Sequence, residues 1–387
     1  MSNTMTVFQA RSIFTPYREI KNGFMALDNG KIVALGSAEE QPTGTGVTIQ
    51  DFGEFTLVPG FIDLHHHGAF GYRASDGSIE ALDAIARFLP STGTTGWLPT
   101  VDDLPSVRAI GDFARKNNSG AKPLGIHMEG PFLAPKNLPG TDYEAPRKAD
   151  IEVFDELYEA SGGLIRIVGI APELEGALEL IAHMRACGVV PACAHTKTDY
   201  AQWLRAVDAG LQHVTHTYNV MTGFHHRRPG VVGGVLTTDC VTAELIGDGF
   251  HVDPVAIDVL IRCKGVDQIA LITDSVRYAG LPDGQYDQVI KQAGIIRRVG
   301  FDESVDGSMA GSAWTMDHNI RYLVKDLGIP LANVLRMVSS VPARIVGLAH
   351  SKGSLQVGKD ADFTILDDNL GIVATFVAGG QVFARSQ

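Results

Sequence analysis

The sequence predicts an α/β protein: a (β/α)8 TIM barrel with a small β-sandwich domain formed by both chain termini. The middle of the chain alternates eight short apolar segments with amphipathic ones, as parallel strands joined by helices do. Both ends contain only strand-like runs separated by polar turns. Histidines and carboxylates close several apolar segments, which is typical of a barrel whose active site lies at the carboxyl ends of its strands.

The two ends of the chain are expected to pair with each other. Near the N-terminus, MTVFQARSIF and NGFMALDNGKIVALG carry apolar runs, and Asp28-Asn29-Gly30 is a tight-turn signal. Near the C-terminus, DADFTILDDN and GIVATFVAGGQVFAR have the same character. We therefore predict a β-sandwich domain from residues 1–58 and 346–387, with a barrel domain, residues 59–345, inserted into it.

The predicted barrel strands are 57–65, 94–99, 123–128, 165–171, 190–194, 212–217, 243–247 and 268–273. Helical patterns lie between them, and those of residues 174–188 and 199–210 end at a glycine suited to a C-cap. A doubly wound open sheet is the alternative. It would place ligands near one switch point, whereas metal-capable or proton-transfer residues here close five of the eight strands, which favours the barrel.

The overall charge and the cysteines limit the partners and the cellular location that we expect for the protein. A net charge of −12 argues against nucleic acid or an anionic membrane as the main partner. The four cysteines form no CxxC pair, as expected of reduced thiols in the cytosol. We see neither a signal peptide nor a run of roughly 18 apolar residues that would span a membrane. We therefore expect a cytoplasmic protein.

The first predicted barrel strand ends in three consecutive histidines. Because side chains alternate across a strand, His65 and His67 share a face and His66 points away. Two imidazoles on one face suit a metal ion, and a surface histidine run is the alternative. Glu129 closes the third strand before Gly130-Pro131, and His127 shares its face. A structural ion pair is the alternative for Glu129.

His195 and His216 each close a strand and are one βα repeat apart, so both imidazoles can reach one ion. Taken singly, each could be an ordinary core histidine. Two imidazoles and a carboxylate leave a position open for water, as in catalytic rather than structural zinc sites. We predict one or two divalent ions, zinc first, with iron, cobalt and manganese as alternatives. His66 and His127 are candidates for supporting the ligands.

Asp274 closes the last predicted strand. A carboxylate there can take a proton from an activated water and return it to a leaving group; a helix N-cap is the alternative. His251 lies on a loop beyond the seventh strand and suits polarisation of a substrate carbonyl, while Asp248 and Gly249 can shape that turn.

From about residue 50 to its end, the sequence contains an ordered series of motifs: PGFIDLHHHG, GIHMEGPFL, APE (171–173), AHT, VTHTYNVM, RPG, DGFHVD, LITDS and DGSMAGS. In order and spacing this series resembles the N-acetylglucosamine-6-phosphate deacetylases of the amidohydrolase superfamily. PARIVGL and KGSLQVGKDADFTILD resemble the closing segment. The resemblance implies metal-dependent hydrolysis of the acetamide of N-acetylglucosamine 6-phosphate to glucosamine 6-phosphate and acetate.

The resemblance also implies residue roles. The family's metal ligands match Glu129, His195 and His216. A second metal site of the family matches His65 and His67, with Glu129 as a possible bridge. The general base and acid matches Asp274, and the residue that supports the amide carbonyl matches His251. Substrate contacts fall on Gly140, Thr141, Asn219, Val220, His251, Met309 and Ala310. Arg227, or the adjacent Arg228, matches a phosphate-binding arginine that reaches across a homodimer interface.

One segment departs from the family pattern. Where members usually have a lysine-glycine-alanine-histidine stretch, this chain has NLPGTDYEAPR, with Thr141 and Asp142 at the end of that stretch. An aspartate near a phosphate would repel it unless paired with an arginine, although HHRRPG, which replaces a less basic stretch of the family, can restore positive charge. An amidohydrolase for another N-acetyl-hexosamine phosphate or an N-acyl amino acid is therefore the alternative. A non-catalytic scaffold is a third interpretation, opposed by the complete ligand set.

Overall fold

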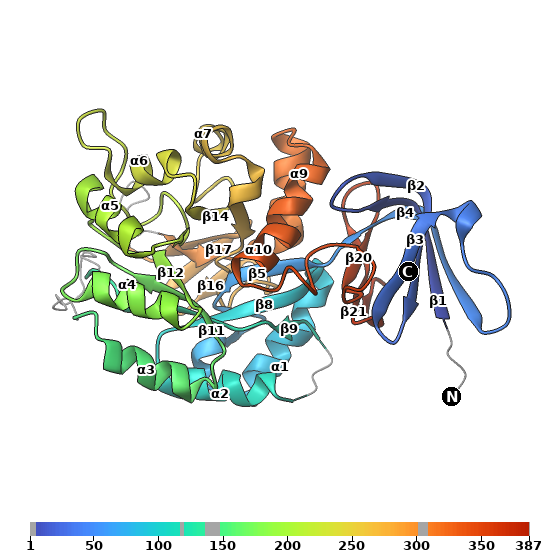
Figure 1. Ribbon diagram of the computed structural model, residues 1–387, viewed down its shortest axis with the longest axis horizontal. Coiled ribbons are helices and arrows are strands. Elements are labelled where there is room, and N and C mark those ends of the chain that lie inside the picture. Colours follow the sequence, from blue (N-terminus) through green and yellow to red (C-terminus); the bar gives the residue numbers. More distant parts are fainter. Residues whose placement is uncertain (1–4, 117–119, 136–147, 301–308, 387) are drawn as a thin grey trace.

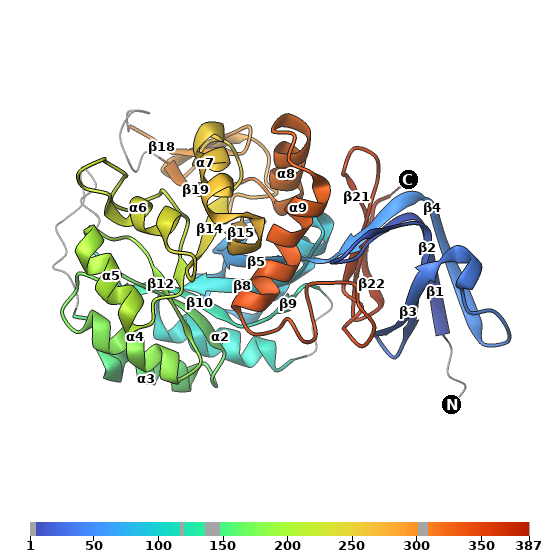
Figure 2. The ribbon, with the colours of Figure 1, turned by 45° about the horizontal axis from the view of Figure 1, so that its top comes forward.

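The computed structural model describes residues 5–116, 120–135, 148–300 and 309–386. Within these ranges, eight parallel strands and their surrounding helices form a barrel, which stands beside a sheet that contains both termini (Figures 1 and 2). The predicted fold class, a TIM barrel with a β-domain from both ends of the chain, is confirmed.

Each predicted barrel strand is present, and the strands pair in chain order. They are β5 (Phe61–His66), β8 (Thr94–Val101), β10 (Ile126–Phe132), β11 (Ile165–Ile170), β12 (Val190–Cys193), β13 (His213–Val214), β14 (Thr242–Ile246) and β15 (Ile269–Ile272); β9 (Lys122–Pro123) pairs with β8. The predicted segment 57–65 divides at Gly60, because its first residues pair within the terminal sheet and the others begin the barrel.

The barrel closes where its first and last strands meet. Just beyond β15, the Asp274 amide donates to the His65 carbonyl (3.1 Å) and the His67 amide donates to the Ser275 carbonyl (2.8 Å). The Asp63 carboxylate accepts the Thr273 hydroxyl at 2.6 Å and ties the same two strands. These bonds fix the carboxyl ends of β5 and β15 against each other.

Ten α-helices lie within the described residues: α1 (Ile79–Phe88), α2 (Leu104–Ala114), α3 (Ile151–Ala160), α4 (Ala177–Ala186), α5 (Tyr200–Ala209), α6 (Gly230–Thr237), α7 (Pro254–Lys264), α8 (Met316–Arg321), α9 (Leu331–Leu335) and α10 (Val341–Ile345). Side-chain caps start several of them, as when Ser78, Asp103 and Asp199 accept backbone N–H groups of the first turn. The helical patterns predicted at residues 174–188 and 199–210 correspond to α4 and α5.

The barrel interior is filled by aliphatic side chains from alternate positions of the strands. Ile62, Leu64, Leu98, Ile167, Ala192, Ile246 and Ile272 are buried there together with Val341 and Ala343 of α10. Each fully buried Leu, Ile or Val contributes about 1.5–3 kcal/mol relative to an exposed one. The centre is therefore a packed core, and it supports the polar residues at the carboxyl ends of the strands.

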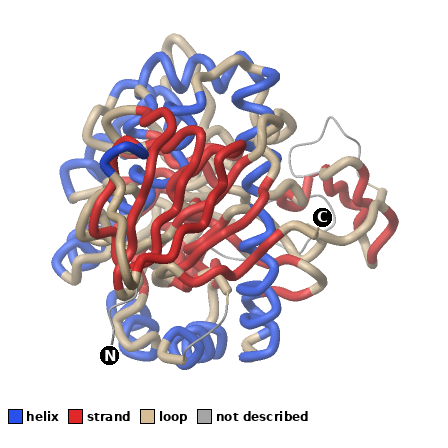
Figure 3. Tube along the Cα trace, turned by 90° about the vertical axis from the view of Figure 1, so that its right-hand side faces the viewer, coloured by secondary structure: helices blue, strands red, loops and turns tan. Residues whose placement is uncertain are grey.

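The terminal strands form one mixed sheet in the order β22-β21-β20-β4-β1-β2-β3. They are β1 (Met5–Phe14), β2 (Glu19–Asp28), β3 (Lys31–Ser37), β4 (Val47–Pro59), β20 (Phe363–Leu366), β21 (Ile372–Val377) and β22 (Gly380–Ala384), seen side by side in Figure 3. The Phe8 and Phe376 ring centroids are 5.1 Å apart. In a flat sheet, three strand spacings of about 4.8 Å would separate β1 from β21. The sheet therefore curls over a shared aromatic core, as a sandwich does.

A further small sheet follows the last barrel strand and was not predicted. It consists of β16 (Gly284–Tyr286), β17 (Val289–Gln292), β18 (Ile295–Arg298) and β19 (Met309–Ser312), and β6 (Gly68–Ala69) pairs separately with β7 (Tyr72–Arg73). Ser312 of β19 bridges to Ser275, which places this sheet next to the barrel mouth. Within the described residues, none of the helices has the length and apolarity needed to cross a bilayer.

Candidate active site

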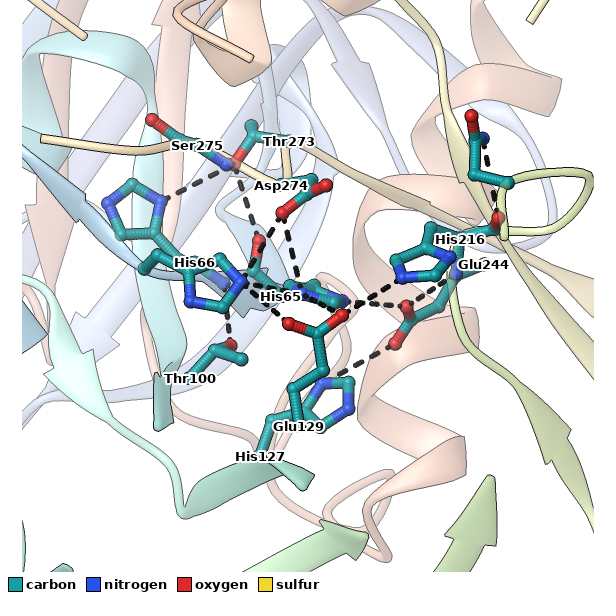
Figure 4. A network of polar contacts seen from close by, with 12 residues as sticks. His65, His66, Thr100, His127, Glu129, His216, Glu244, Thr273, Asp274 and Ser275 are labelled. Carbon is teal, nitrogen blue, oxygen red and sulfur yellow. Dashed lines mark hydrogen bonds and ion pairs between the residues drawn. The ribbon is translucent and has the colours of Figure 1, made fainter. Parts of the chain in front are cut away.

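Six of the residues singled out in the sequence gather at the carboxyl ends of the barrel strands. His65 is the penultimate residue of β5 and His67 lies just beyond that strand, Glu129 lies in β10, and His195, His216 and Asp274 follow β12, β13 and β15. Figure 4 shows the Glu129 carboxylate between His65, His216 and Asp274. Residues that are far apart in the chain thus share one polar centre.

Three of these residues have a left-handed backbone, which is unusual for side chains other than glycine. The φ angles are 39° for His195, 30° for His216 and 49° for Asp274. Such a conformation costs of order 1–3 kcal/mol and persists only where its surroundings enforce it. At each position the chain has just left a buried strand. The sharp turn keeps the side chain at the mouth instead of continuing the strand.

Glu129, His195 and His216 form the first compact group. The Oε1 atom of Glu129 lies 2.7 Å from His195 Nε2 and 2.9 Å from His216 Nε2, and the two nitrogens are 3.0 Å apart. Ligands of a tetrahedral zinc ion, with bonds of about 2.0–2.1 Å, are separated by about 3.4 Å. The three atoms therefore fit a divalent ion after small outward shifts.

His65, His67 and Asp274 form a second group directly beside the first. The two Nε2 atoms are 3.1 Å apart, and Asp274 Oδ1 lies 3.5 Å from that of His65 and 3.4 Å from that of His67. The second oxygen of Glu129, Oε2, lies 3.2 Å from His67 Nε2. The Glu129 carboxylate thus faces both groups, one oxygen toward each.

The protonation preferences of the centre favour bound positive charge. Burial disfavours charged imidazoles, yet Asp274 and Glu129 raise the pKa of His65 to about 9 and that of His67 to about 10. Burial likewise opposes ionisation of Glu129, but the neighbouring His195 and His65 hold its pKa well below the usual value. Ionised carboxylates in a buried site require a compensating cation. Protons on the imidazoles or a divalent metal can fill that role.

Glu244 supports this centre and was missed in the sequence. It is fully buried in β14, where Oε2 lies 3.0 Å from His65 Nδ1 and accepts the His216 amide at 3.1 Å, and Oε1 lies 3.2 Å from His213 Nε2. Burial opposes its charge, but His65 and the hydrogen-bonding His213 hold its pKa well below the usual value. A carboxylate inside the apolar run VTAELIG was the available signal, because a buried charge needs partners.

His66 and His127, the two histidines predicted to support the metal ligands, lie behind the two groups described above. His66 turns away from His65 and His67, and its Nδ1 lies 3.2 Å from Asp63 Oδ2. Its ring packs edge-on against Trp97. His127 Nδ1 lies 3.0 Å from the Leu64 carbonyl, and burial lowers the pKa of His127 to about 3, which leaves it neutral. Both therefore contact residues around the first two groups rather than the open side.

His251 lies beyond β14 and is held by its neighbour Asp248. Its Nδ1 lies 2.7 Å from Asp248 Oδ2, and Asp248 Oδ1 accepts the Phe250 and His251 amides at 2.9 Å. Ser312 donates to the same carboxylate at 3.2 Å. Burial alone would lower the pKa of His251, but Asp248, with a smaller effect of Asp274, raises it. Asp248 therefore fixes the His251 ring near Asp274.

The predicted substrate contacts are only partly gathered at this mouth. Asn219 and Val220 lie three and four residues after His216, whose carbonyl accepts the Asn219 amide at 3.0 Å, and Met309 and Ala310 lie in β19. Arg227 and Arg228 are exposed on the loop before α6, where Arg227 Nη1 lies 2.9 Å from His226 Nε2. Neither arginine forms an ion pair with a described residue. Gly140, Thr141 and Asp142 lie outside the described residues.

Comparisons with known proteins agree with this geometry. The model of the amidohydrolase family matches residues 56–382. N-acetylglucosamine-6-phosphate deacetylase of Bacillus subtilis (strain 168) is 35% identical over 385 residues, covering 97% of this chain and 96% of the relative. N-acetylgalactosamine-6-phosphate deacetylase of Escherichia coli O157:H7 is 33% identical, covering 96% and 98%. A mutant N-acetyl-D-glucosamine-6-phosphate deacetylase of Mycobacterium smegmatis, solved with N-acetyl-D-glucosamine-6-phosphate, has a TM-score of 0.88 at 29% identity, covering 98% and 100%.

Proposed function

Since the chain belongs to the amidohydrolase family and is a deacetylase of the N-acetylglucosamine-6-phosphate deacetylase type, we propose that it hydrolyses N-acetylglucosamine 6-phosphate to glucosamine 6-phosphate and acetate. The observation that carries this proposal is the pair of adjacent groups, Glu129-His195-His216 and His65-His67-Asp274, at the barrel mouth. Their buried imidazoles and carboxylates are consistent with one or more divalent metal ions.

The first group would hold one ion and the paired histidines, His65 and His67, a second, with Glu129 between them. We favour zinc because imidazole and carboxylate ligands suit it, with iron, cobalt or manganese as alternatives. A bound divalent ion supplies two things here, polarisation of the amide carbonyl and a water of lowered pKa. Glu244 holds the His65 ring through Nδ1, which leaves Nε2 turned to the site.

Asp274 is proposed as the general base and then the general acid. Burial disfavours its charge, but His65 and His67 lower its pKa, so the carboxylate is ionised and ready to accept a proton at neutral pH. It takes the proton of the attacking water and delivers it to the sugar nitrogen as the C–N bond breaks. His251, whose Nδ1 faces Asp248, is left with Nε2 to hydrogen-bond the amide oxygen as charge develops on it.

The remaining predicted contacts are proposed to hold the sugar phosphate. Asn219, Val220, Met309 and Ala310 adjoin the centre through the segments that carry His216 and Ser312. The phosphate would be held by Arg227, or by Arg228, reaching the site of a second subunit in a homodimer. Such a role agrees with the exposure of both arginines. Gly140 and Thr141 are proposed as further contacts on the strength of the sequence alone.

We also propose the domain division into residues 1–58 with 346–387 and residues 59–345. Leu355 and Ala361, which precede β20, are buried in the core of the terminal sheet, which supports placing the C-terminal segment there. The cytoplasmic location stays a prediction. It is supported by four cysteines that form no disulfide.

The proposal is tested by measuring free amine released from three substrates by the zinc-loaded protein. N-acetylglucosamine 6-phosphate, its galacto epimer and unphosphorylated N-acetylglucosamine are compared at equal concentration. We expect the first to have the highest kcat/KM, with the unphosphorylated sugar far below it. A preference for the galacto epimer would redirect the proposal to the substrate named for the Escherichia coli relative. No turnover of any of the three by metal-loaded protein would contradict it.

A further inference from the structure

A group of metal-capable side chains also lies outside the candidate active site, between the outer helices α3 and α4. Asp155 belongs to α3, His183 to the last turn of α4, and Cys187 caps that helix. Figures 1 and 2 both show these helices side by side on the outside of the barrel. Of the three-residue groups of this kind in the described residues, it is the one that contains a thiol.

The ligand atoms of this group converge on one point. His183 Nε2 lies 2.7 Å from Asp155 Oδ1 and 3.8 Å from Cys187 Sγ, and all three atoms lie within 4.8 Å of one another. A tetrahedral zinc ion with bonds of about 2.0–2.3 Å separates its ligand atoms by about 3.4–3.7 Å. Small rotations of the side chains would therefore place all three around one ion.

The helices hold these side chains in position without an ion. His183 and Cys187 are four residues apart, so they lie one above the other on the same face of α4. The His183 ring makes a T-shaped contact with Phe154, a buried residue of α3, with centroids 5.7 Å apart and planes at 90°. Packing between α3 and α4 thus fixes the imidazole before any ion binds. Metal binding would therefore cost little additional conformational entropy at His183.

The donor set selects the metal. Thiolate, imidazole and carboxylate together suit zinc, whereas magnesium, calcium and manganese prefer oxygen ligands. The His183 and Asp155 side chains are 31% and 47% exposed, so water can provide a fourth ligand. Burial and the charge of Asp155 raise the pKa of the Cys187 thiol. An incoming ion must therefore displace the thiol proton, so that binding strengthens as the pH rises.

The location of the group separates it from catalysis. α4 leads into β12, which begins at Val190, so the last turn of α4 lies near the amino end of the strand that His195 follows at the other end. In barrels of this kind the amino-end face contributes stability, and the active site lies at the carboxyl-end face. An ion bound there would clip α3 to α4 without contacting substrate.

We propose that Asp155, His183 and Cys187 form a zinc site that clips α3 to α4 at the face of the barrel opposite the candidate active site. The competing interpretation is an ordinary ion pair between Asp155 and His183, with Cys187 an incidental neighbour. The proposal does not depend on the substrate of the enzyme. Its failure would leave the function above unchanged.

Cobalt(II) titration separates the two interpretations when the full-length protein carries zinc in the candidate active site only and the Asp155-His183-Cys187 group is left empty. Cobalt bound to a thiolate shows a sulfur-to-metal charge-transfer band in the near ultraviolet, and the proposed active-site ligands include no sulfur. Cys240 and Cys263 are exposed and are replaced by serine in all proteins compared. We expect a band that saturates at one cobalt per chain at micromolar concentrations, disappears in Cys187→Ser and weakens at least tenfold in His183→Gln. No band, or an equal band in Cys187→Ser, would overturn the proposal.

A thermal shift provides the second readout. Added zinc should raise the Tm of the active-site-loaded parent but not that of Cys187→Ser, while kcat and KM of the two proteins agree within about twofold. Matching turnover shows that Cys187→Ser is folded. If Cys187→Ser does not fold, His183→Gln is used in its place. Equal thermal shifts in parent and variants would contradict a zinc clip at this place.

Discussion

Glu244 Oε2 lies 3.0 Å from His65 Nδ1, and both side chains are fully buried. The contact joins β14 to β5 across the barrel and determines which nitrogen of His65 faces Asp274 and His67. A ring held at Nδ1 by a carboxylate has a fixed orientation and a more basic Nε2. The properties of the second candidate group therefore depend on a residue that touches neither His67 nor Asp274 in the described structure.

Replacing Glu244 by Gln should weaken metal binding while preserving the shape of the site. The amide keeps a similar volume but loses the charge that holds His65, and such supporting contacts are worth about 10–100-fold in metal affinity. Competition with a zinc-responsive fluorescent chelator measures the effect. Glu80→Gln, an exposed position on α1, is the matched control and should bind zinc as the parent does. An unchanged affinity in folded Glu244→Gln would show that Glu244 does not support the metal ligands.

Substitution of His251 should reduce turnover without removing metal. Loss of a hydrogen-bond donor to the developing charge on the amide oxygen typically costs about 10²–10³ in kcat, so His251→Gln is expected in that range. Asp248→Asn should cost less, because it loosens the His251 ring without removing it. Steady-state kinetics and metal analysis of both variants provide the test. A normal kcat in His251→Gln would remove this residue from the mechanism.

Chelation should destabilise the protein reversibly. An ion that binds only the folded state stabilises it by about 2.7 kcal/mol when its free concentration is 100 times Kd. Without it, the carboxylates of Glu129 and Asp274 are balanced only by protons on neighbouring imidazoles. We expect a lower Tm after chelator treatment and recovery on addition of zinc. Calorimetry in which the treated and untreated proteins unfold at the same temperature, despite complete metal removal, would argue against a metal in the folded state.

Lys352 makes a testable contribution to the stability of the C-terminal segment, residues 346–387. Its Nζ lies 2.6 Å from Asp362 Oδ2 and 2.9 Å from Asp360 Oδ2, and its side chain is 17% exposed. Lys352→Met leaves Asp362 without this cation and Asp360 with Lys31 alone, which should cost roughly 1–3 kcal/mol of unfolding free energy at pH 7. Urea unfolding measures this cost, and Lys116→Met, an exposed lysine, is the control expected to change little.

The loss of unfolding free energy in Lys352→Met should depend on pH, and the direction of this dependence can be predicted. Burial opposes ionisation of Asp360, but Lys31 and Lys352 lower its pKa below the usual value. The ion pair between Asp360 and Lys352 therefore stabilises the fold above the pKa of about 4 that an aspartate has in the unfolded chain. This stabilisation is lost as the pH falls through the lower pKa that Asp360 has in the folded protein. The difference between Lys352→Met and the parent should shrink in acid. A constant difference from pH 7 to pH 3 would mean that charge is not its cause.

Much of the barrel and of the polar centre followed from local patterns in the sequence. Short β-branched runs such as IALIT mark buried strands, and a polar residue at the end of each run must reach the mouth of a barrel. The alternation of side chains predicted that His65 and His67 lie together with His66 turned away, as they do. The sharing of one sheet by the strands of both termini followed from their common strand-like character.

Other features depend on contacts that no local pattern encodes. The role of Glu244 became visible only when His65, His127 and His213 were placed around it by different strands. The sheet β16–β19 was missed because its short strands resemble loop segments between the last barrel strand and α8. The reach of Arg227 would depend on a second subunit, so that role remains a prediction.

The measurement that tests the central claim most directly compares the zinc-loaded parent with Asp274→Asn on N-acetylglucosamine 6-phosphate. Acetate and free amine release are followed together, and the metal content of both proteins is determined by mass spectrometry. An asparagine can stay near His65 and His67 but cannot accept the proton of water, so we predict full metal content and a loss of kcat of at least about 10²–10⁴-fold. Near-normal turnover by metal-loaded Asp274→Asn would contradict the assignment of Asp274 and the mechanism built on it.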